Sequence, residues 1–340
     1  MSLKSLGCKA AIALLLQASF ISADCECGYR VPSSGNPQEP TKYLLFTDSI
    51  QTDFRGMTSL NDSSDWKIKD LRLEYVPNKS RFGRIVEDRN VIFNPAVDPL
   101  VTPDGPSQQG ADVDAGLQLI VRSELVEDNL VSTGQIQSIR EDVRFGSFRA
   151  YMKSTPINGT CAASFWYHND SQEIDIELLS RQREDGRQPI NLSVQSNESV
   201  ANDYDATGTT GFIEGQADFD PADGFHEYRY DWSPDVISFW ADGGWLGDIV
   251  DFIPTTPGYF QLSHWSNGFA GWSAGPPSQD ALIMVAYFRG YFNSTDPVRA
   301  QEFEERCGGG RSAGSVCDVS GFEQVTRPWS SILAKTDFEK

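Results

Sequence analysis

The 340-residue sequence is poor in basic residues: 28 Lys and Arg stand against 48 Asp and Glu, a formal net charge of −20. A chain this acidic lacks the positive surface that binds nucleic acid, and anionic membrane faces would repel it. We therefore expect no nucleic acid or membrane partner, and a neutral substrate.

Long apolar runs are also scarce, although 39% of the residues are hydrophobic. The run at residues 10–20 is too short to span a bilayer, which takes about 20 residues. Two lysines precede it and small residues follow at Ser22 and Ala23, the pattern of a secretory signal peptide. We expect residues 1–23 to be that peptide and the protein to be secreted and extracellular.

Asn-x-Ser/Thr sequons for N-linked glycans agree with secretion. Their asparagines are Asn61, Asn78, Asn158, Asn169, Asn191, Asn197 and Asn293. We therefore expect a glycoprotein.

Cysteine is sparse, and its number is odd once the signal peptide is set aside. The remaining residues are Cys25, Cys27, Cys161, Cys307 and Cys317. At most two disulfides can form, which leaves one thiol. Cys307 and Cys317 flank a Gly-rich stretch and could close a local loop, whereas Cys25-Glu26-Cys27 does not have the spacing of a zinc site. We expect structural disulfides with the pairing open, and neither a metal nor a cofactor.

Clean helical stripes are absent, and Gly, Pro, Asn and Asp interrupt short β-rich runs. Strands at this spacing indicate an all-β sandwich rather than alternating strands and helices. The runs are residues 116–121, 144–152, 161–168, 174–178, 190–194, 228–231, 236–240 and 281–291. We predict an N-terminal arm at 24–42, one main domain at 43–298 and a C-terminal appendage at 299–340.

Three acids alternate with apolar residues in the segment 171–179. On a strand, Glu173, Asp175 and Glu177 share one face, although neighbouring acids repel one another and are disfavoured in strands. The Cα atoms of the two glutamates would be about 13 Å apart. Side chains that lean together approach the ~5–5.5 Å carboxyl separation of a retaining glycosidase. A solvated acidic strand and calcium binding are the alternatives.

The segment Glu173-Ile174-Asp175-Ile176-Glu177 resembles the catalytic signature of glycoside hydrolase family 16, especially its licheninase-like, endo-1,3(4)-β-glucanase-like members of the fungal secreted type. Residues 145–153 are similar to the strand that precedes this signature in the family. Residues 225–232 and 237–243 are similar to the downstream strand pair. The resemblance continues in order through Thr256-Pro257-Gly258 and Trp265-Ser266-Asn267-Gly268, and it spans roughly residues 43–292.

This resemblance implies a β-jelly-roll sandwich of two curved antiparallel sheets, of the concanavalin A-like lectin and glucanase type, with a sugar cleft on the concave face. It also implies that Glu173 is the nucleophile, Asp175 its assisting acid and Glu177 the general acid/base. The five-residue spacing is that of family members without a bulge in the catalytic strand.

Substrate contacts are predicted on the same resemblance, because aromatic rings stack on the apolar faces of sugars. The predicted substrate-binding residues are Phe165, Tyr167, Trp265, Trp272, Ser263 and His168. His264 is a further candidate, whereas His226 and Trp245 are assigned to structural roles.

We expect a monomeric, retaining endo-β-glucanase that hydrolyses β-1,3 or mixed β-1,3/1,4 glucan through a covalent glycosyl-enzyme intermediate. Two alternatives stay open. One is a cell-wall glucan transglycosylase, in which a second sugar accepts the intermediate. The other is a non-catalytic carbohydrate-binding protein, because fold alone does not fix function.

Overall fold

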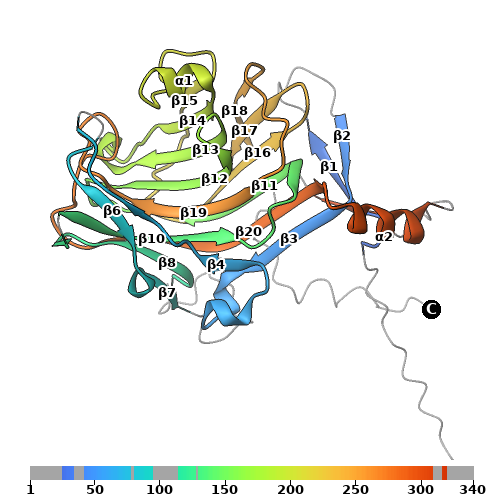
Figure 1. The fold of residues 1–340 in the computed structure, drawn as a ribbon, viewed down its shortest axis with the longest axis horizontal. Coiled ribbons are helices and arrows are strands. Elements are labelled where there is room, and N and C mark those ends of the chain that lie inside the picture. The colour runs from blue at the N-terminus through green and yellow to red at the C-terminus, as the bar shows by residue number, and fades with distance from the viewer. Residues whose placement is uncertain are drawn as a thin grey trace, which may run out of the picture.

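Two large sheets stacked face to face form the body of the computed structural model (Figure 1). The structure describes residues 25–33, 42–77, 80–94, 114–127, 129–308 and 316–319. The expected signal peptide at 1–23 and the sequon at Asn78 lie outside these residues.

The first large sheet carries the acidic strand. Its strands, in spatial order, are β15 (Phe212–Gly215), β14 (Ile190–Gln195), β13 (Gln172–Leu179), β12 (Cys161–Asn169), β19 (Tyr259–Trp265), β10 (Leu130–Ser138), β6 (Gly83–Val86) and β5 (Arg72–Leu73), with β4 (Trp66–Ile68) and β9 (Leu125–Val126) also paired to β10. All neighbours are antiparallel except β6, which runs parallel to β10.

The second large sheet is antiparallel throughout its described strands. Its strands, in spatial order, are β18 (Gly244–Ile249), β17 (Ile237–Ala241), β16 (His226–Trp232), β11 (Val143–Lys153), β20 (Ala281–Ser294), β8 (Gly116–Val121) and β7 (Val91–Asn94), with β3 (Asp48–Asp53) also paired to β20.

Helix is scarce in the described residues. The α-helices are α1 (Asn197–Ala201) and α2 (Pro297–Cys307), and the 3-10 turns are η1 (Phe54–Gly56), η2 (Leu60–Asp62), η3 (Asp88–Asn90) and η4 (Ser180–Gln182). No helix of the described residues is long and apolar enough to cross a membrane. The predicted all-β sandwich is confirmed, and each predicted β-rich run overlaps a strand.

The core lies between the two large sheets and is rich in aromatic rings. Trp166 of β12 packs on Trp232 of β16 with ring centroids 4.5 Å apart. Phe260 of β19 packs on Phe148 and Phe288 of the facing sheet at 4.3 and 4.8 Å. Alternate residues of each strand enter this core, so the opposite face of the first sheet is free to carry polar side chains.

A small third sheet and two disulfides join the ends of the described chain. Strand β1 (Tyr29–Ser33) pairs with β2 (Lys42–Phe46) and, in parallel, with β21 (Cys317–Asp318). Cys25 is bonded to Cys317 and Cys27 to Cys307. The expected structural disulfides are present, and Cys307 and Cys317 do not close a local loop, because both bonds reach the N-terminal segment.

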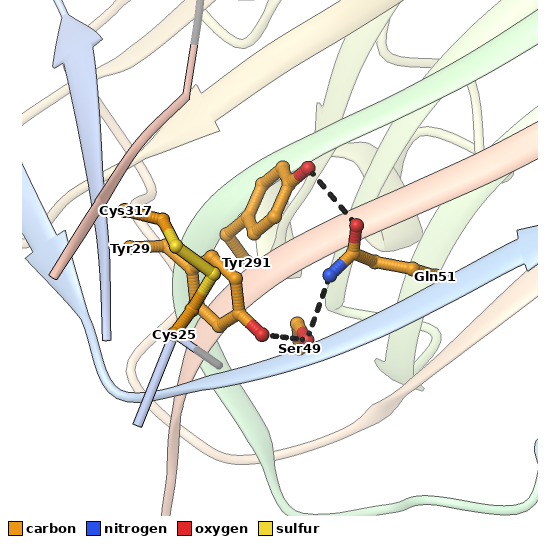
Figure 2. The surroundings of a disulfide bond; sticks show 6 residues. All are labelled: Cys25, Tyr29, Ser49, Gln51, Tyr291 and Cys317. Atoms are coloured by element: carbon orange, nitrogen blue, oxygen red, sulfur yellow. Dashed lines mark hydrogen bonds between the residues drawn. A yellow bond between two sulfur atoms is a disulfide. The ribbon is translucent and has the colours of Figure 1, made fainter. Parts of the chain in front are cut away.

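The joined ends dock on the second large sheet beside the Cys25–Cys317 bond. Figure 2 shows Ser49 donating to the hydroxyl of Tyr29 at 3.0 Å, and Gln51 donating to Ser49 at 3.2 Å. The rings of Tyr29 and Tyr291 lie 4.9 Å apart. Strand β1, which lies in the segment predicted as an N-terminal arm, therefore packs on the sandwich.

Candidate active site

The three acids of β13 point away from the core. The apolar residues of the strand enter the core between the sheets, so Glu173, Asp175 and Glu177 lie on the opposite face. We call this the carboxylate face. It also carries the residues paired with the acids, namely Tyr167, Phe165 and Ala163 on β12 and Gln195, Ser193 and Asn191 on β14.

Glu177 accepts hydrogen bonds on both carboxylate oxygens. The Cys161 thiol donates to Oε1 at 3.1 Å, and the Trp272 indole N–H donates to Oε2 at 2.9 Å. Cys161 starts β12, whereas Trp272 lies in the loop after β19. Two separate elements therefore hold this carboxylate.

Arg181 anchors the loop that carries Trp272. Its guanidinium, in the turn after the acidic strand, donates to the carbonyl oxygens of Trp272 at 2.6 Å and Gly271 at 2.5 Å. The turn that ends β13 thus also fixes the position of the indole that contacts Glu177.

Asp175 is the most buried of the three acids, with 4% of its surface exposed. The Ser193 hydroxyl, across the strand pair on β14, donates to Asp175 Oδ2 at 2.8 Å. Asp175 also shares a side-chain hydrogen bond with Glu173. The two carboxyl groups therefore titrate as an interacting pair rather than independently.

Crowding of buried acids raises all three pKa values. Burial first, and then the charge of Asp175, raises the pKa of Glu177 to about 7. Burial raises the pKa of Asp175 to about 6, and burial with the charge of Asp175 raises that of Glu173 well above its ordinary value. Glu177 can therefore carry a proton near neutral pH, as a general acid requires.

Phe165 and Tyr167 lie beside the acids, directly across from Asp175 and Glu173 on the neighbouring strand. Both aromatic side chains are partly buried. Each can present part of its ring to a sugar next to the carboxylates. Their contact with a sugar stays a prediction.

Trp265 ends β19 on the same face, opposite Cys161. The guanidinium of Arg84, from β6, lies 4.6 Å from the centroid of its ring. Burial lowers the pKa of Arg84, while the charges of Glu173 and Glu177 oppose that shift. The sequence reasoning missed this cation, because β6 is short and joins the sheet by a parallel pairing that no local pattern indicates.

Ser263 is buried within a polar network on the carboxylate face. Its hydroxyl donates to Gln135 Oε1 at 3.1 Å, and Gln135 Nε2 donates to Gln261 Oε1 at 2.5 Å. Gln135 and Gln261 were not predicted as site residues. The sequence pattern that could have indicated these two glutamines is a polar residue at every second position of β10 and β19.

His168 lies at the bulge that ends β12, exposed, with Nδ1 2.8 Å from the carbonyl oxygen of Pro257, and its contact with a sugar stays a prediction. The roles predicted for His264 and Trp245 do not fit the structure. His264 is fully buried, bonds the carbonyl oxygen of Leu119, and has its pKa lowered by burial to about 4. Trp245 is 40% exposed rather than part of the core.

One sequon forms part of the site. Asn191 is buried on β14, and its Nδ2 donates to Gln182 Oε1 at 2.8 Å and to the Glu177 carbonyl oxygen at 3.3 Å. Ser193, the third residue of this sequon, bonds Asp175. In the folded protein this asparagine is committed to the site and is not available to a glycan.

Two stacked sheets, with paired and hydrogen-bonded carboxylates on one outer face, define a β-sandwich of the glycoside hydrolase class. The sequence model described as "Glycosyl hydrolases family 16" matches residues 104–280, just over half of the chain. The chain belongs to this family.

Known relatives are distant. The β-glucanase of Bacillus subtilis is 25% identical over 143 residues, which cover 41% of this chain and 53% of the relative. The chain thus spans about half the length of the curated relatives it matches.

Among solved structures, the Bacillus licheniformis β-glucanase has a TM-score of 0.50 and 18% identity over 72% of this chain and 97% of its own. The Thermotoga maritima laminarinase catalytic domain has a TM-score of 0.51 and 14% identity over 72% and 96%. At these identities the likeness shows the fold.

Proposed function

We propose that this protein is a retaining endo-β-glucanase that cleaves β-1,3 or mixed β-1,3/1,4 glucan. The observation that carries the proposal is the set of three carboxyl groups on one outer face, with Glu177 held by two donors and Asp175 paired with Glu173. Such a set supplies a nucleophile and an acid/base on the same strand.

In the first step, a carboxylate oxygen of Glu173 bonds the anomeric carbon while the glycosidic C–O bond breaks. Glu177 gives its proton to the departing oxygen, and Asp175 carries the proton of the Glu173–Asp175 pair. Water then attacks the anomeric carbon, loses its proton to Glu177, and releases the Glu173 carboxylate. Both groups return to their starting protonation states.

A β-glucan fits the surroundings of these acids. Partly buried rings of Phe165, Tyr167 and Trp265 offer stacking surfaces, while the glutamine network and Arg84 offer hydrogen-bond partners for hydroxyl groups. The related proteins named a β-glucanase and a laminarinase support this substrate class. Two long-range disulfides support a secreted protein, because such bonds persist in oxidising compartments.

The test is product analysis on laminarin, barley mixed-linkage glucan, lichenan and xyloglucan oligosaccharides. We expect shorter oligosaccharides from laminarin or a mixed-linkage glucan, and a fall in turnover by a factor of about 10³ or more for Glu173→Gln and Glu177→Gln. Glu214→Gln is the matched control, because this exposed glutamate lies opposite Asn191 at the edge of the same sheet.

Each other outcome has a definite meaning. Products longer than the starting oligosaccharide would replace hydrolysis by transglycosylation with the same carboxylates. Binding without cleavage, unchanged in the glutamine variants, would establish a carbohydrate-binding protein. Wild-type turnover in either glutamine variant would overturn the assigned mechanism.

A further inference from the structure

Among the described residues, Cys161 is the free cysteine, and it lies beside the carboxylate of Glu177. Cys161 is fully buried and unpaired by disulfide, yet its Sγ contacts the carboxylate of Glu177 at 3.1 Å. Buried apolar neighbours on the same face, Ala163 and Leu179, surround it. A thiol packed only for its volume has no need of a carboxylate partner.

The Cys161 thiol is in the protonation state that a hydrogen-bond donor needs. Burial first, and then the nearby Glu177, raises the pKa of Cys161 well above its ordinary value. The sulfur therefore keeps its proton and points it at the carboxylate, where a thiol is a weak donor. A thiolate nucleophile is excluded on the same ground.

The second donor is stronger and comes from elsewhere in the chain. Trp272 reaches the other oxygen of Glu177 from a loop that Arg181 anchors. Both hydrogen bonds favour the charged carboxylate and lower the pKa of Glu177, against burial and the charge of Asp175, which raise it.

We propose that Cys161 and Trp272 are positioning residues for the acid/base of the reaction: one donor on each carboxylate oxygen fixes the plane of Glu177 toward the departing oxygen of the substrate. This inference rests on the proposed function. It goes beyond a stacking role for Trp272, and it assigns a role to the thiol left over from the disulfides.

Other charged groups around Glu177 set the background. Asp175 and Glu173 lie on its own strand, and Arg84 reaches toward it from β6. The facing residue on β14 is the uncharged Asn191. Substitution of Cys161 or Trp272 leaves these charged groups in place. A change in the pKa of Glu177 in such a variant therefore reports the loss of the hydrogen-bond donor.

The test is the pH dependence of kcat/KM for Cys161→Ala and Trp272→Phe. Each change removes a donor and raises the pKa of Glu177, so the basic limb moves to higher pH, by roughly half a unit for the thiol and one unit for the indole. Cys161→Ser retains a donor and should keep the wild-type limb. Trp245→Phe, on an exposed indole of β18, is the control for loss of a tryptophan.

Leaving-group dependence separates positioning from damage to the fold. Turnover of laminarin or barley glucan should fall roughly tenfold in Cys161→Ala and Trp272→Phe. For dinitrophenyl β-cellobioside or β-laminaribioside, kcat/KM should stay near wild type in Cys161→Ala, because this leaving group departs without a proton and kcat/KM does not include the later water step that Glu177 assists. Equal losses on both substrates, with no shift of the basic limb, would overturn the inference.

A measurement without substrate distinguishes failure of the inference from failure of the proposed function. The infrared S–H stretching band of Cys161 should shift as Glu177 titrates, with a midpoint near its pKa of about 7. The band should not titrate there in Glu177→Gln. A band that ignores pH in the wild-type protein contradicts the hydrogen bond, whatever the enzyme cleaves.

Discussion

At the residue scale, Glu173, Asp175 and Glu177 share one face of β13, and donors from neighbouring strands bond Asp175 and Glu177. The alternation of the segment indicates the shared face but not these donors. Ser193 and Cys161 reach those acids across strand pairs, and register between distant strands cannot be read from local pattern. Whether the predicted aromatic residues contact sugar stays a prediction.

The raised pKa of Glu177 predicts a dependence of stability on pH. The folded value of about 7 lies above the ordinary value of 4.5, so the folded state holds the proton more tightly. This contribution is fully present below about pH 4.5 and is lost as pH rises through about 7, and a shift of this size corresponds to about 3 kcal/mol.

Glu177→Gln cannot ionise, so its melting temperature relative to wild type should rise by a few degrees between pH 5 and pH 8. Thermal unfolding of both proteins across this range checks it. Glu214→Gln should show no such trend, because that side chain is exposed. If the difference in melting temperature between Glu177→Gln and wild type did not change with pH, ionisation of Glu177 would cost the folded state little free energy.

Ser193→Ala is predicted to disturb the Glu173–Asp175 pair. The lost hydrogen bond favours the charged form of Asp175, so its removal raises the pKa of that carboxyl group above about 6. Asp175 then keeps the proton of the pair up to a higher pH, and its charge raises the pKa of Glu177 less, so the basic limb of kcat/KM should move to lower pH. Ser193→Thr, which keeps a hydroxyl, should restore the wild-type limb; an unchanged limb in Ser193→Ala would remove serine from the mechanism.

At the scale of elements, the sequence predicts most strands but not how the ends are joined. Each predicted β-rich run overlaps an observed strand, because alternation is a local property. The pairing of Cys27 with Cys307 spans 280 residues, and nothing local distinguishes it from a bridge within the tail. The parallel addition of β6, which brings Arg84 toward the acids, is non-local for the same reason.

The Cys27–Cys307 bond should stabilise the sandwich without affecting its chemistry. The paired change Cys27→Ala with Cys307→Ala should lower the free energy of unfolding by about 2–5 kcal/mol. Denaturant unfolding measures this, and the pH profile of kcat/KM should stay as in wild type, because neither cysteine lies on the carboxylate face. Unchanged stability would show that β1 and α2 hold the ends together without the bond.

At the scale of the whole molecule, the all-β fold and the family follow from ordered motifs that lie within the family match at residues 104–280. The linkage of the glucan does not, because it depends on how several strands and loops combine around one sugar chain. Gln135 of β10, Gln261 and Ser263 of β19, and Arg84 of β6 come from three separate segments. Their arrangement exists only in the folded sandwich.

The roles of the two glutamates are the central claim, and azide rescue with an activated aryl β-glycoside tests them most directly. For Glu177→Ala, azide should restore turnover and yield the β-glycosyl azide, because the glycosyl-enzyme on Glu173 still forms. For Glu173→Ala, azide should attack the substrate itself and yield the α-glycosyl azide. The reversed pair of anomers, or rescue of neither variant while the wild type cleaves the same glycoside, would contradict the account.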